Sequence, residues 1–363
     1  MSKLDLYTNA RLQALRDVQD PLADDAVPFL VRHPELAKEI NAWDNFPDSY
    51  PVHFPDPLIR FLDFYKTDPP RWDEKKIITA QTFFSQQGST YLALLGFYSL
   101  PYCYAFADGA QVLVRSKRIM EEQGKRLIET AGFVMECFRP GSFISSDRAK
   151  LVIAKVRLIH AFARYFINER ATDWQHEWGK PVNQEDMIGT NGAFSFIVAR
   201  GFRKLRQPLD SETVLALLHY WEIIGYYMGV DITYWPTDMK EANYLDQLIR
   251  KRQMKPSKAG EQLIDSLMAH YKKTGEPPLT NFMETVVSYF VGEQASICLG
   301  LEKAVPLSPS LFASVLNFNF KIQASKSYSQ LEAEFRKIVK QDYGGDATIN
   351  IPVLPPHIRK NVH

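Results

Sequence analysis

The sequence predicts an all-α protein built as a single large helical domain. From Trp72 to about Arg252 prolines are sparse, and the apolar residues recur at helical spacing. Residues that cap helices stand where these segments begin: Asp210 and Ser211 precede a run of leucines, and Thr280 precedes NFMETVV. Strand signals are few, and the clearest is INIPVL at 349–354.

The N-terminal segment is a proline-rich lead-in that we expect to wrap the core. Nine of the 22 prolines fall within the first 70 residues. Proline lacks the backbone donor and disfavours helix at the residue before it, so short helices and extended connections are predicted here. The domain boundaries follow as 1–80 for this segment, 81–305 for the main helical domain and 306–363 for a C-terminal helix with an irregular, Gly- and Pro-rich tail. Helices are predicted near 73–87, 109–138, 146–170, 184–200, 210–229, 237–253, 257–273 and 279–302.

The composition excludes several classes of function. Lysine plus arginine (43) balances aspartate plus glutamate (42), so nothing attracts the chain to nucleic acid. The three cysteines form no CxxC pair, which argues against a disulfide framework or a zinc ribbon. The longest uncharged stretch, 82–107, contains several polar residues and a proline, so we expect no stable membrane insertion. The N-terminus lacks the apolar run of a signal peptide, and a cytoplasmic location is predicted.

Aromatic residues are abundant, with 23 Phe, 17 Tyr and 6 Trp. Side chains of this size fill a core or line a roomy apolar pocket. The helix predicted at 147–170 adds a polar feature to this apolar background. Arg157, His160 and Arg164 interrupt an otherwise apolar run at spacing i, i+3 and i+7, so they share one helix face.

Two buried arginines require anionic partners. A carboxylate-bearing ligand such as haem, whose propionates pair with arginine while an imidazole binds the iron, would supply them. Two alternatives remain open. His160 could be an ordinary core histidine, and Arg157 and Arg164 could pair with buried Glu or Asp from neighbouring helices.

A second predicted helix, 116–138, carries Arg126, Glu129 and Thr130 close together. A cation, a carboxylate and a hydroxyl on one face could position a bound diatomic molecule and move protons. The same residues could also form a solvated face with an ordinary ion pair.

Two further segments carry polar residues. Asn183 is expected to cap the helix after PVNQED, although one of the following carboxylates could pair with the buried arginines. His219 could be a second metal ligand, but a packing role is favoured. No Glu-x-x-His pair, HExxH, Walker loop, GxGxxG, GxSxG or CxxCH occurs, so any haem would be held non-covalently.

These helices resemble the DUF2236 family, the catalytic domain of latex-clearing rubber oxygenases and MpaB-type oxygenases. The resemblance lies in SLPYCYAFADGAQVLVRSKRI, KRLIETAGF, VRLIHAFAR, PVNQEDMIGTNGAFSF and HYWEIIGYYMGVD, and it spans roughly 85–300. It implies a globin-like helical core that holds haem b.

Transferred residue by residue, the resemblance makes His160 the proximal iron ligand, with Arg157 and Arg164 beside it to fix the haem. It makes Arg126 and Thr130 the distal pair. The sequence departs from the family at one position between Arg126 and Thr130. Rubber oxygenases carry a lysine at this position, and this sequence has Glu129. A carboxylate could serve as a base.

The resulting hypothesis is a haem-dependent oxygenase that uses O₂ on an unsaturated apolar small molecule and cleaves its C=C bond, with an electron donor that the sequence does not identify. One alternative is a haem peroxidase or peroxygenase driven by peroxide. Another is a non-enzymatic carrier whose arginines hold the carboxylate of a hydrophobic ligand.

Overall fold

The computed structural model describes residues 3–115, 123–274, 283–301, 327–345 and 348–353. Within these ranges the protein is helical and contains no β-strand, only the isolated bridges Phe106–Met254 and Ser142–Ser146. The predicted all-α class is therefore confirmed.

The proline-rich lead-in folds as predicted into short helices joined by extended turns. Proline occupies the first or second position of three of them, where its missing donor costs nothing. The elements are the 3₁₀ turn η1 (Lys3–Leu6), α1 (Asn9–Leu15), α2 (Pro21–Arg32), α3 (Pro34–Asn41), α4 (Asp56–Asp63) and the 3₁₀ turn η2 (Phe64–Lys66).

The remaining helices form the core and its cover. They are α5 (Glu74–Leu94), the π-helical segment η3 (Leu95–Ser99), α6 (Leu100–Tyr104), α7 (Ala107–Val114), α9 (Gln123–Cys137), α10 (Arg148–Arg170), the 3₁₀ turn η4 (His176–Trp178), α11 (Gln184–Phe194), α12 (Phe196–Lys204), α13 (Ser211–Tyr227), the 3₁₀ turn η5 (Ile232–Tyr234), α14 (Met239–Gln253), α15 (Lys258–Thr274), α17 (Met283–Val291), α18 (Glu293–Cys298) and α20 (Tyr328–Tyr343).

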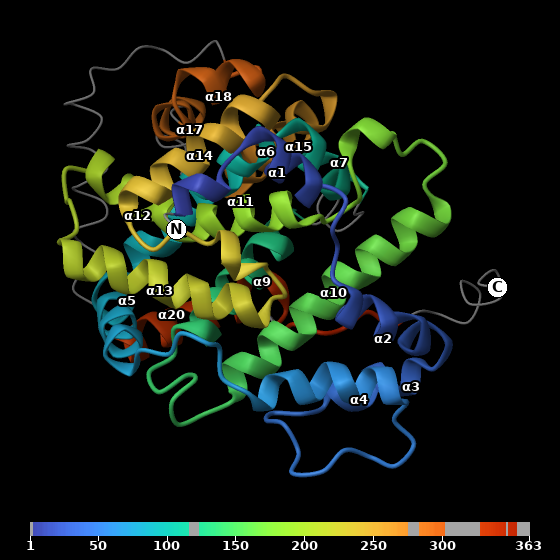
Figure 1. Cartoon of the computed structure of the whole chain (residues 1–363). Helices are drawn as coiled ribbons and strands as arrows, with labels where there is room; N and C mark the ends of the chain where they lie inside the picture. Colours follow the sequence, from blue (N-terminus) through green and yellow to red (C-terminus); the bar gives the residue numbers. More distant parts are fainter. Residues whose placement is uncertain (1–2, 116–122, 275–282, 302–326, 346–347, 354–363) are drawn as a thin grey trace.

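The helix α10 has a central place in this arrangement. Figure 1 shows α10 crossing the molecule obliquely, with the lead-in helices α2, α3 and α4 beside it. It packs against α2, α9 and α13. Contacts on several sides explain why most of its circumference is apolar and buried, as the sequence indicates. No helix in the described part of the chain is long and apolar enough to cross a membrane.

Two predicted helices are interrupted in the structure. The helix expected over 184–200 breaks at Ser195, whose backbone leaves the helical region, so α11 and α12 are separate. The helix expected over 279–302 breaks at Gly292, which has φ +83° and separates α17 from α18. The helix expected over 109–138 is seen as α7 and α9, and the segment that joins these two helices lies outside the described residues. Thr280, the expected helix cap, also lies outside them.

The prediction of a strand at 349–354 was wrong for residues 349–353, the part of it that the structure describes. Residues 349–353 belong to no helix and pair with no strand among the described residues. Asn41 substitutes for a partner strand, because its amide donates to the carbonyl of Ile351 at 2.9 Å and its oxygen accepts from the Ile351 N–H at 2.8 Å. The Asn41 side chain thus satisfies both the N–H and the carbonyl of Ile351. This segment, which has the alternating apolar pattern of a strand, is therefore held in place without a β-sheet. The predicted boundary at 80 falls inside α5.

Candidate oxygenase site between two helices

The two arginines of α10 are paired with aspartates of the lead-in. Arg157 donates to both carboxylate oxygens of Asp20, at 2.7 and 2.8 Å, and also to the carbonyl of Tyr227. Arg164 donates to Asp24 at 2.6 Å and lies 3.7 Å from Asp20. The open alternative, in which neighbouring helices supply the anions, is therefore what the structure shows. The carrier hypothesis gave these guanidinium groups to a ligand carboxylate, and here Asp20 and Asp24 take that role.

The backbone at Gly229 makes room for the Arg157–Asp20 pair. A Cβ atom at this position would lie 2.7 Å from both Arg157 Nε and Asp20 Oδ2. The residue also has φ +81°, a conformation that side-chain-bearing residues rarely adopt. The glycine in the MGVD segment is therefore required by a close approach of side chains to the backbone.

His160 lies at the edge of a different face of α10. Burial, together with the charges of Arg164 and Arg126 and against that of Asp20, lowers the pKa of His160 to about 3, so the imidazole is neutral. Its Nδ1 atom is buried and has no hydrogen-bond partner among the described residues. The side chain nevertheless keeps some accessible surface. A residue deep in the protein that remains partly accessible borders a space that protein atoms do not fill.

The neighbours of His160 on this face are apolar and also partly accessible. Val152, Val156, Ile159 and Ala163 follow one another at spacings of three and four along α10, while the residues between them other than His160 are buried. We call these four residues the apolar strip. His160 is the polar group at its edge, which is a suitable position for an imidazole facing an apolar ligand.

The helix α9 faces α10 and brings the second set of predicted residues to the same region. The positive charge of Arg126 acts on His160, which fits the packing of α9 against α10. Arg126 lies 3.8 Å from Glu129, whose side chain is mostly buried. The Thr130 hydroxyl donates to the carbonyl of Arg126 at 2.9 Å. The structure thus brings Arg126, Glu129 and Thr130 together, and the charge of Arg126 reaches His160.

The family is established by a match over most of this region. The family model described as the catalytic domain of ER-bound oxygenase mpaB/B'/rubber oxygenase matches residues 103–315. The chain belongs to this oxygenase family. All six candidate residues lie inside the match, whereas Asp20 and Asp24, the partners of the two arginines, lie outside it.

Two relatives agree with this family membership. A rubber oxygenase from Streptomyces sp. (strain K30) is 20% identical over 293 residues, which cover 79% of this chain and 71% of the relative. The solved structure of latex clearing protein LCP in the closed state has the same fold, with a TM-score of 0.74 and 18% identity. That comparison covers 93% of this chain and 95% of the other.

Sequence reasoning missed the aspartates that pair with the arginines of this oxygenase-family chain. Asp20 precedes α2 and Asp24 lies in its first turn, four residues apart at the start of a helix that begins with proline. Acidic residues are common at such positions because they complement the helix dipole, so the pattern carried no long-range signal. Only the requirement of buried arginines for anions pointed toward partners of this kind.

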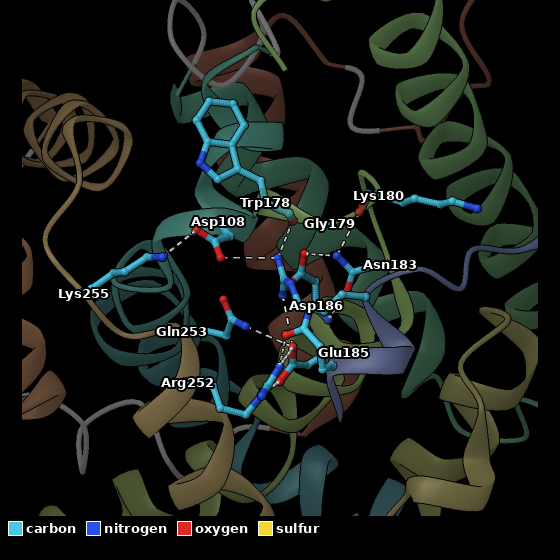
Figure 2. A network of polar contacts seen from close by, with 12 residues as sticks. Asp108, Trp178, Gly179, Lys180, Asn183, Glu185, Asp186, Arg252, Gln253 and Lys255 are labelled. Carbon is cyan, nitrogen blue, oxygen red and sulfur yellow. Dashed lines mark hydrogen bonds and ion pairs between the residues drawn. The ribbon is translucent and has the colours of Figure 1, made fainter. Parts of the chain in front are cut away.

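A second buried charge cluster joins the lead-in to α11 of the oxygenase domain. Arg16 donates to Glu185 at 3.2 Å and to Asp186 at 3.0 Å, and it lies 3.6 Å from Asp108. Figure 2 shows Arg252 and Gln253 of α14 converging on Glu185 from the other side. The alternative that a carboxylate after Asn183 pairs with Arg157 or Arg164 was wrong, because Glu185 and Asp186 pair with Arg16, and Asp20 and Asp24 pair with those two arginines. Asn183 caps α11 as predicted, since its oxygen accepts from the N–H of Asp186.

The carboxyl group of Asp186 makes the stability of this cluster dependent on pH. Burial raises the pKa of Asp186 to about 6, against the opposing charge of Arg16. The carboxyl group in the folded state therefore keeps its proton up to a higher pH than in the unfolded state. The stability of the folded state falls as the pH rises from the ordinary pKa of aspartate to the raised pKa of Asp186. We compare the natural protein with Asp186→Asn, which cannot titrate at this position. The free energy of unfolding of the natural protein minus that of the variant is expected to be about 2 kcal/mol larger at pH 4.5 than at pH 7. Urea unfolding at the two pH values checks this, and an equal difference at both would contradict it.

His219 takes the packing role that the sequence favoured. Its Nδ1 lies 3.4 Å from Glu222 on the same helix, α13, and Glu222 also pairs with Arg71. Its Nε2 is buried without a hydrogen-bond partner among the described residues. Gly225 on the same helix permits the close approach of Asn191, which would lie 2.8 Å from an added Cβ atom.

Proposed function

We propose that this protein is a haem b-dependent oxygenase that uses O₂ to cleave a C=C bond of an unsaturated apolar small molecule into two carbonyl products. The observation that carries the proposal is the neutral, partly accessible imidazole of His160 beside an apolar strip, on a helix that packs against α9, which carries Arg126, Glu129 and Thr130. Membership of an oxygenase family supports the reaction class. When bound, haem iron would supply the activation of O₂.

The residues present fit a haem whose iron is held by His160. A metal ligand must be an unprotonated imidazole, and the low pKa of His160 keeps it so throughout the physiological range. Its buried Nδ1 lacks a partner among the described residues, so the ring has a coordinating or hydrogen-bonding capacity that the surrounding protein does not use. Arg164 is the nearest candidate for a propionate, because its Nη2 is buried and makes no hydrogen bond to the residues described. Arg157 is already fully engaged by Asp20.

The residues of α9 supply the polar chemistry of the proposed site. Arg126 offers a permanent cation that stabilises negative charge developing on oxygen. Glu129, next to it, is the candidate base that accepts or returns a proton. The Thr130 hydroxyl already donates to a backbone carbonyl, so its oxygen remains available to accept a hydrogen bond.

The substrate class rests on the apolar strip and on the relatives. Valine, isoleucine and alanine side chains beside His160 offer dispersion contacts and no hydrogen bonds, which suits a hydrocarbon chain. A relative is named for its action on rubber, a polymer of isoprene units. We infer an unsaturated, isoprenoid-like chain as the substrate of this protein.

The experiment that tests the proposal is an absorption spectrum followed by an oxygen-uptake assay. Purified protein, expressed with a haem precursor, is expected to show a Soret band and to consume O₂ when farnesol is added, with carbonyl products detected by mass spectrometry. Protein that contains no haem under these conditions would overturn the proposal.

A second candidate function is supported by the Arg126–Glu129 pair. A carboxylate beside a cation is also suited to moving a proton between the two oxygens of hydrogen peroxide. Turnover of farnesol that requires peroxide and leaves O₂ unused would favour this peroxygenase reaction over the oxygenase.

Replacing Arg126 by leucine is expected to lower kcat by about 10²- to 10³-fold, because loss of a preorganised charge-stabilising donor has this effect in other enzymes. Steady-state kinetics of carbonyl formation measures it. Lys125→Met is the matched control, since it removes an exposed cation from the same helix and should leave kcat unchanged. A similar loss in both variants would show that net charge, and not the position of Arg126, is responsible.

A further inference from the structure

A large groove opens beside the proposed site and shares both of its helices. It has a volume of about 640 Å³, within the range of ligand-binding pockets. Its walls come from the segment after α3, from α9, α10 and α20, and from the stretch that follows α20. Apolar side chains line much of it, namely Trp43, Met135, Leu151, Val152, Tyr328, Phe335, Val339 and Ile349.

The apolar strip of α10 begins in this groove and runs along the helix toward His160. Val152 lines the groove and begins the strip, which continues through Val156 and Ile159. His160 lies eight positions beyond Val152, which corresponds to about 12 Å along the helix axis. On α9, Gly132 lines the groove and lies only two residues beyond Thr130. A chain-like molecule in the groove can therefore extend along the strip toward the proposed site.

The charged groups in the groove leave cations uncompensated. Glu136 pairs with Arg139 and Arg148, and Glu332 pairs with Arg139 and Arg336. Each of these carboxylates is thus shared by two guanidinium groups. Lys155 and Lys340 also line the groove, and neither has a carboxylate within 4 Å among the residues that the structure describes.

Lys155 is the more unusual of the two because it is only 4% exposed. Its ammonium donates to the carbonyls of Asn41 and Trp43 at 3.2 and 3.4 Å, which are long contacts to neutral groups. A lysine has three donors, so a third remains for a ligand. Burial lowers the pKa of Lys155 even though the charge of Asp44, which also lines the groove without forming an ion pair with Lys155, raises it. An anionic ligand at this position would relieve the cost of burying the ammonium.

We propose that the groove binds the carboxylate head of an unsaturated isoprenoid acid at Lys155, so that its chain runs along the apolar strip toward His160. The proposal rests on the proposed oxygenase function and specifies its substrate class. One buried ammonium matches the single charge of a carboxylate better than the multiple charges of a phosphorylated chain. A fixed head also sets the distance from the head to the double bond that is cleaved.

The test compares farnesoic acid with farnesol, which share a chain and differ only in the head. Binding is measured by isothermal titration calorimetry without turnover, so the result is independent of haem chemistry. The natural protein is expected to bind the acid at least 10-fold more tightly than the alcohol. Lys155→Met should lower affinity for the acid by about 10- to 100-fold, the effect of losing a charge-assisted hydrogen bond, and leave farnesol binding unchanged.

Lys150→Met is the matched control. Lys150 lies on the same helix but pairs with Asp68 and Asp147, and it does not line the groove, so the preference for the acid should persist.

A second variant, Val156→Phe, fills the strip between the groove and His160. It should weaken binding of farnesoic acid more than that of the shorter 3-methyl-2-butenoic acid. Equal affinity for acid and alcohol in the natural protein, survival of the preference in Lys155→Met, or tighter binding of farnesyl phosphate than of the acid would each overturn the proposal. Absence of a Soret band would instead overturn the oxygenase function.

Discussion

Replacing His160 by alanine is expected to abolish the Soret band of the purified protein. The imidazole is the neutral nitrogen ligand at the proposed site, and alanine offers no atom that can bind iron. Absorption spectroscopy and a pyridine haemochromogen assay measure the haem bound per chain. Because the variant replaces a ring that borders unfilled space, circular dichroism should show an unchanged helical fold.

His219→Ala provides the matched control for this experiment. His219 is also a buried histidine on a core helix, but its Nδ1 lies 3.4 Å from Glu222, whereas Nδ1 of His160 has no hydrogen-bond partner among the described residues. The variant should retain a full complement of haem. Retention of the Soret band in His160→Ala, or its loss in both variants, would refute the assignment of His160 as the iron ligand.

Replacing Asp20 by alanine is expected to lower the free energy of unfolding by about 3–5 kcal/mol, because it leaves a buried charge without its partner. Asp20 accepts two hydrogen bonds from Arg157 and lies 3.7 Å from Arg164, and both arginines are buried. Urea unfolding followed by circular dichroism measures the change. Asp25→Ala is the control, because Asp25 is exposed on the same helix, and it should change stability by less than about 0.5 kcal/mol.

The outcome of Asp20→Ala also separates two roles for the arginines. If the pairing of Arg157 with Asp20 is structural, as its two hydrogen bonds indicate, the variant loses stability whether or not haem is present. A loss of less than about 1 kcal/mol would mean that the arginines find other anions and that the pairing with α2 is not what holds them.

The sequence was sufficient to predict the helical class and the grouping of the candidate residues on two helices. Arg157, His160 and Arg164 could be placed on one stretch of α10 because helical geometry is local and regular. The direction of each side chain was not predictable, since it depends on which neighbour packs where. His160 is at the edge of the apolar strip, while the two arginines turn toward α2. That division follows from long-range packing of the lead-in, which periodicity does not encode.

The groove and its lysine were likewise beyond the reach of sequence reasoning. Lys155 lies in the apolar run of the 147–170 helix, where Arg157, His160 and Arg164 are the residues that indicate a site. A lysine on a mostly buried helix usually extends to solvent, so the sequence pattern gave no reason to expect a buried one. Its isolation became visible only when α10, α20 and the segment after α3 were brought together. The breaks at Ser195 and Gly292 were missed for a similar reason, because the apolar pattern continues across both positions.

The placement of Arg16, Asp20 and Asp24 has a consequence for how this protein should be divided. The region that matches the oxygenase family begins at residue 103, yet two of its buried charge clusters are completed by these three residues far upstream. A fragment cut at the start of the match would carry Glu185, Arg157 and Arg164 without these counterions. The stretch that matches the family model is therefore shorter than the part of the chain that supplies the counterions of its buried charges. Natural shuffling or laboratory exchange of this domain would have to carry the N-terminal segment with it.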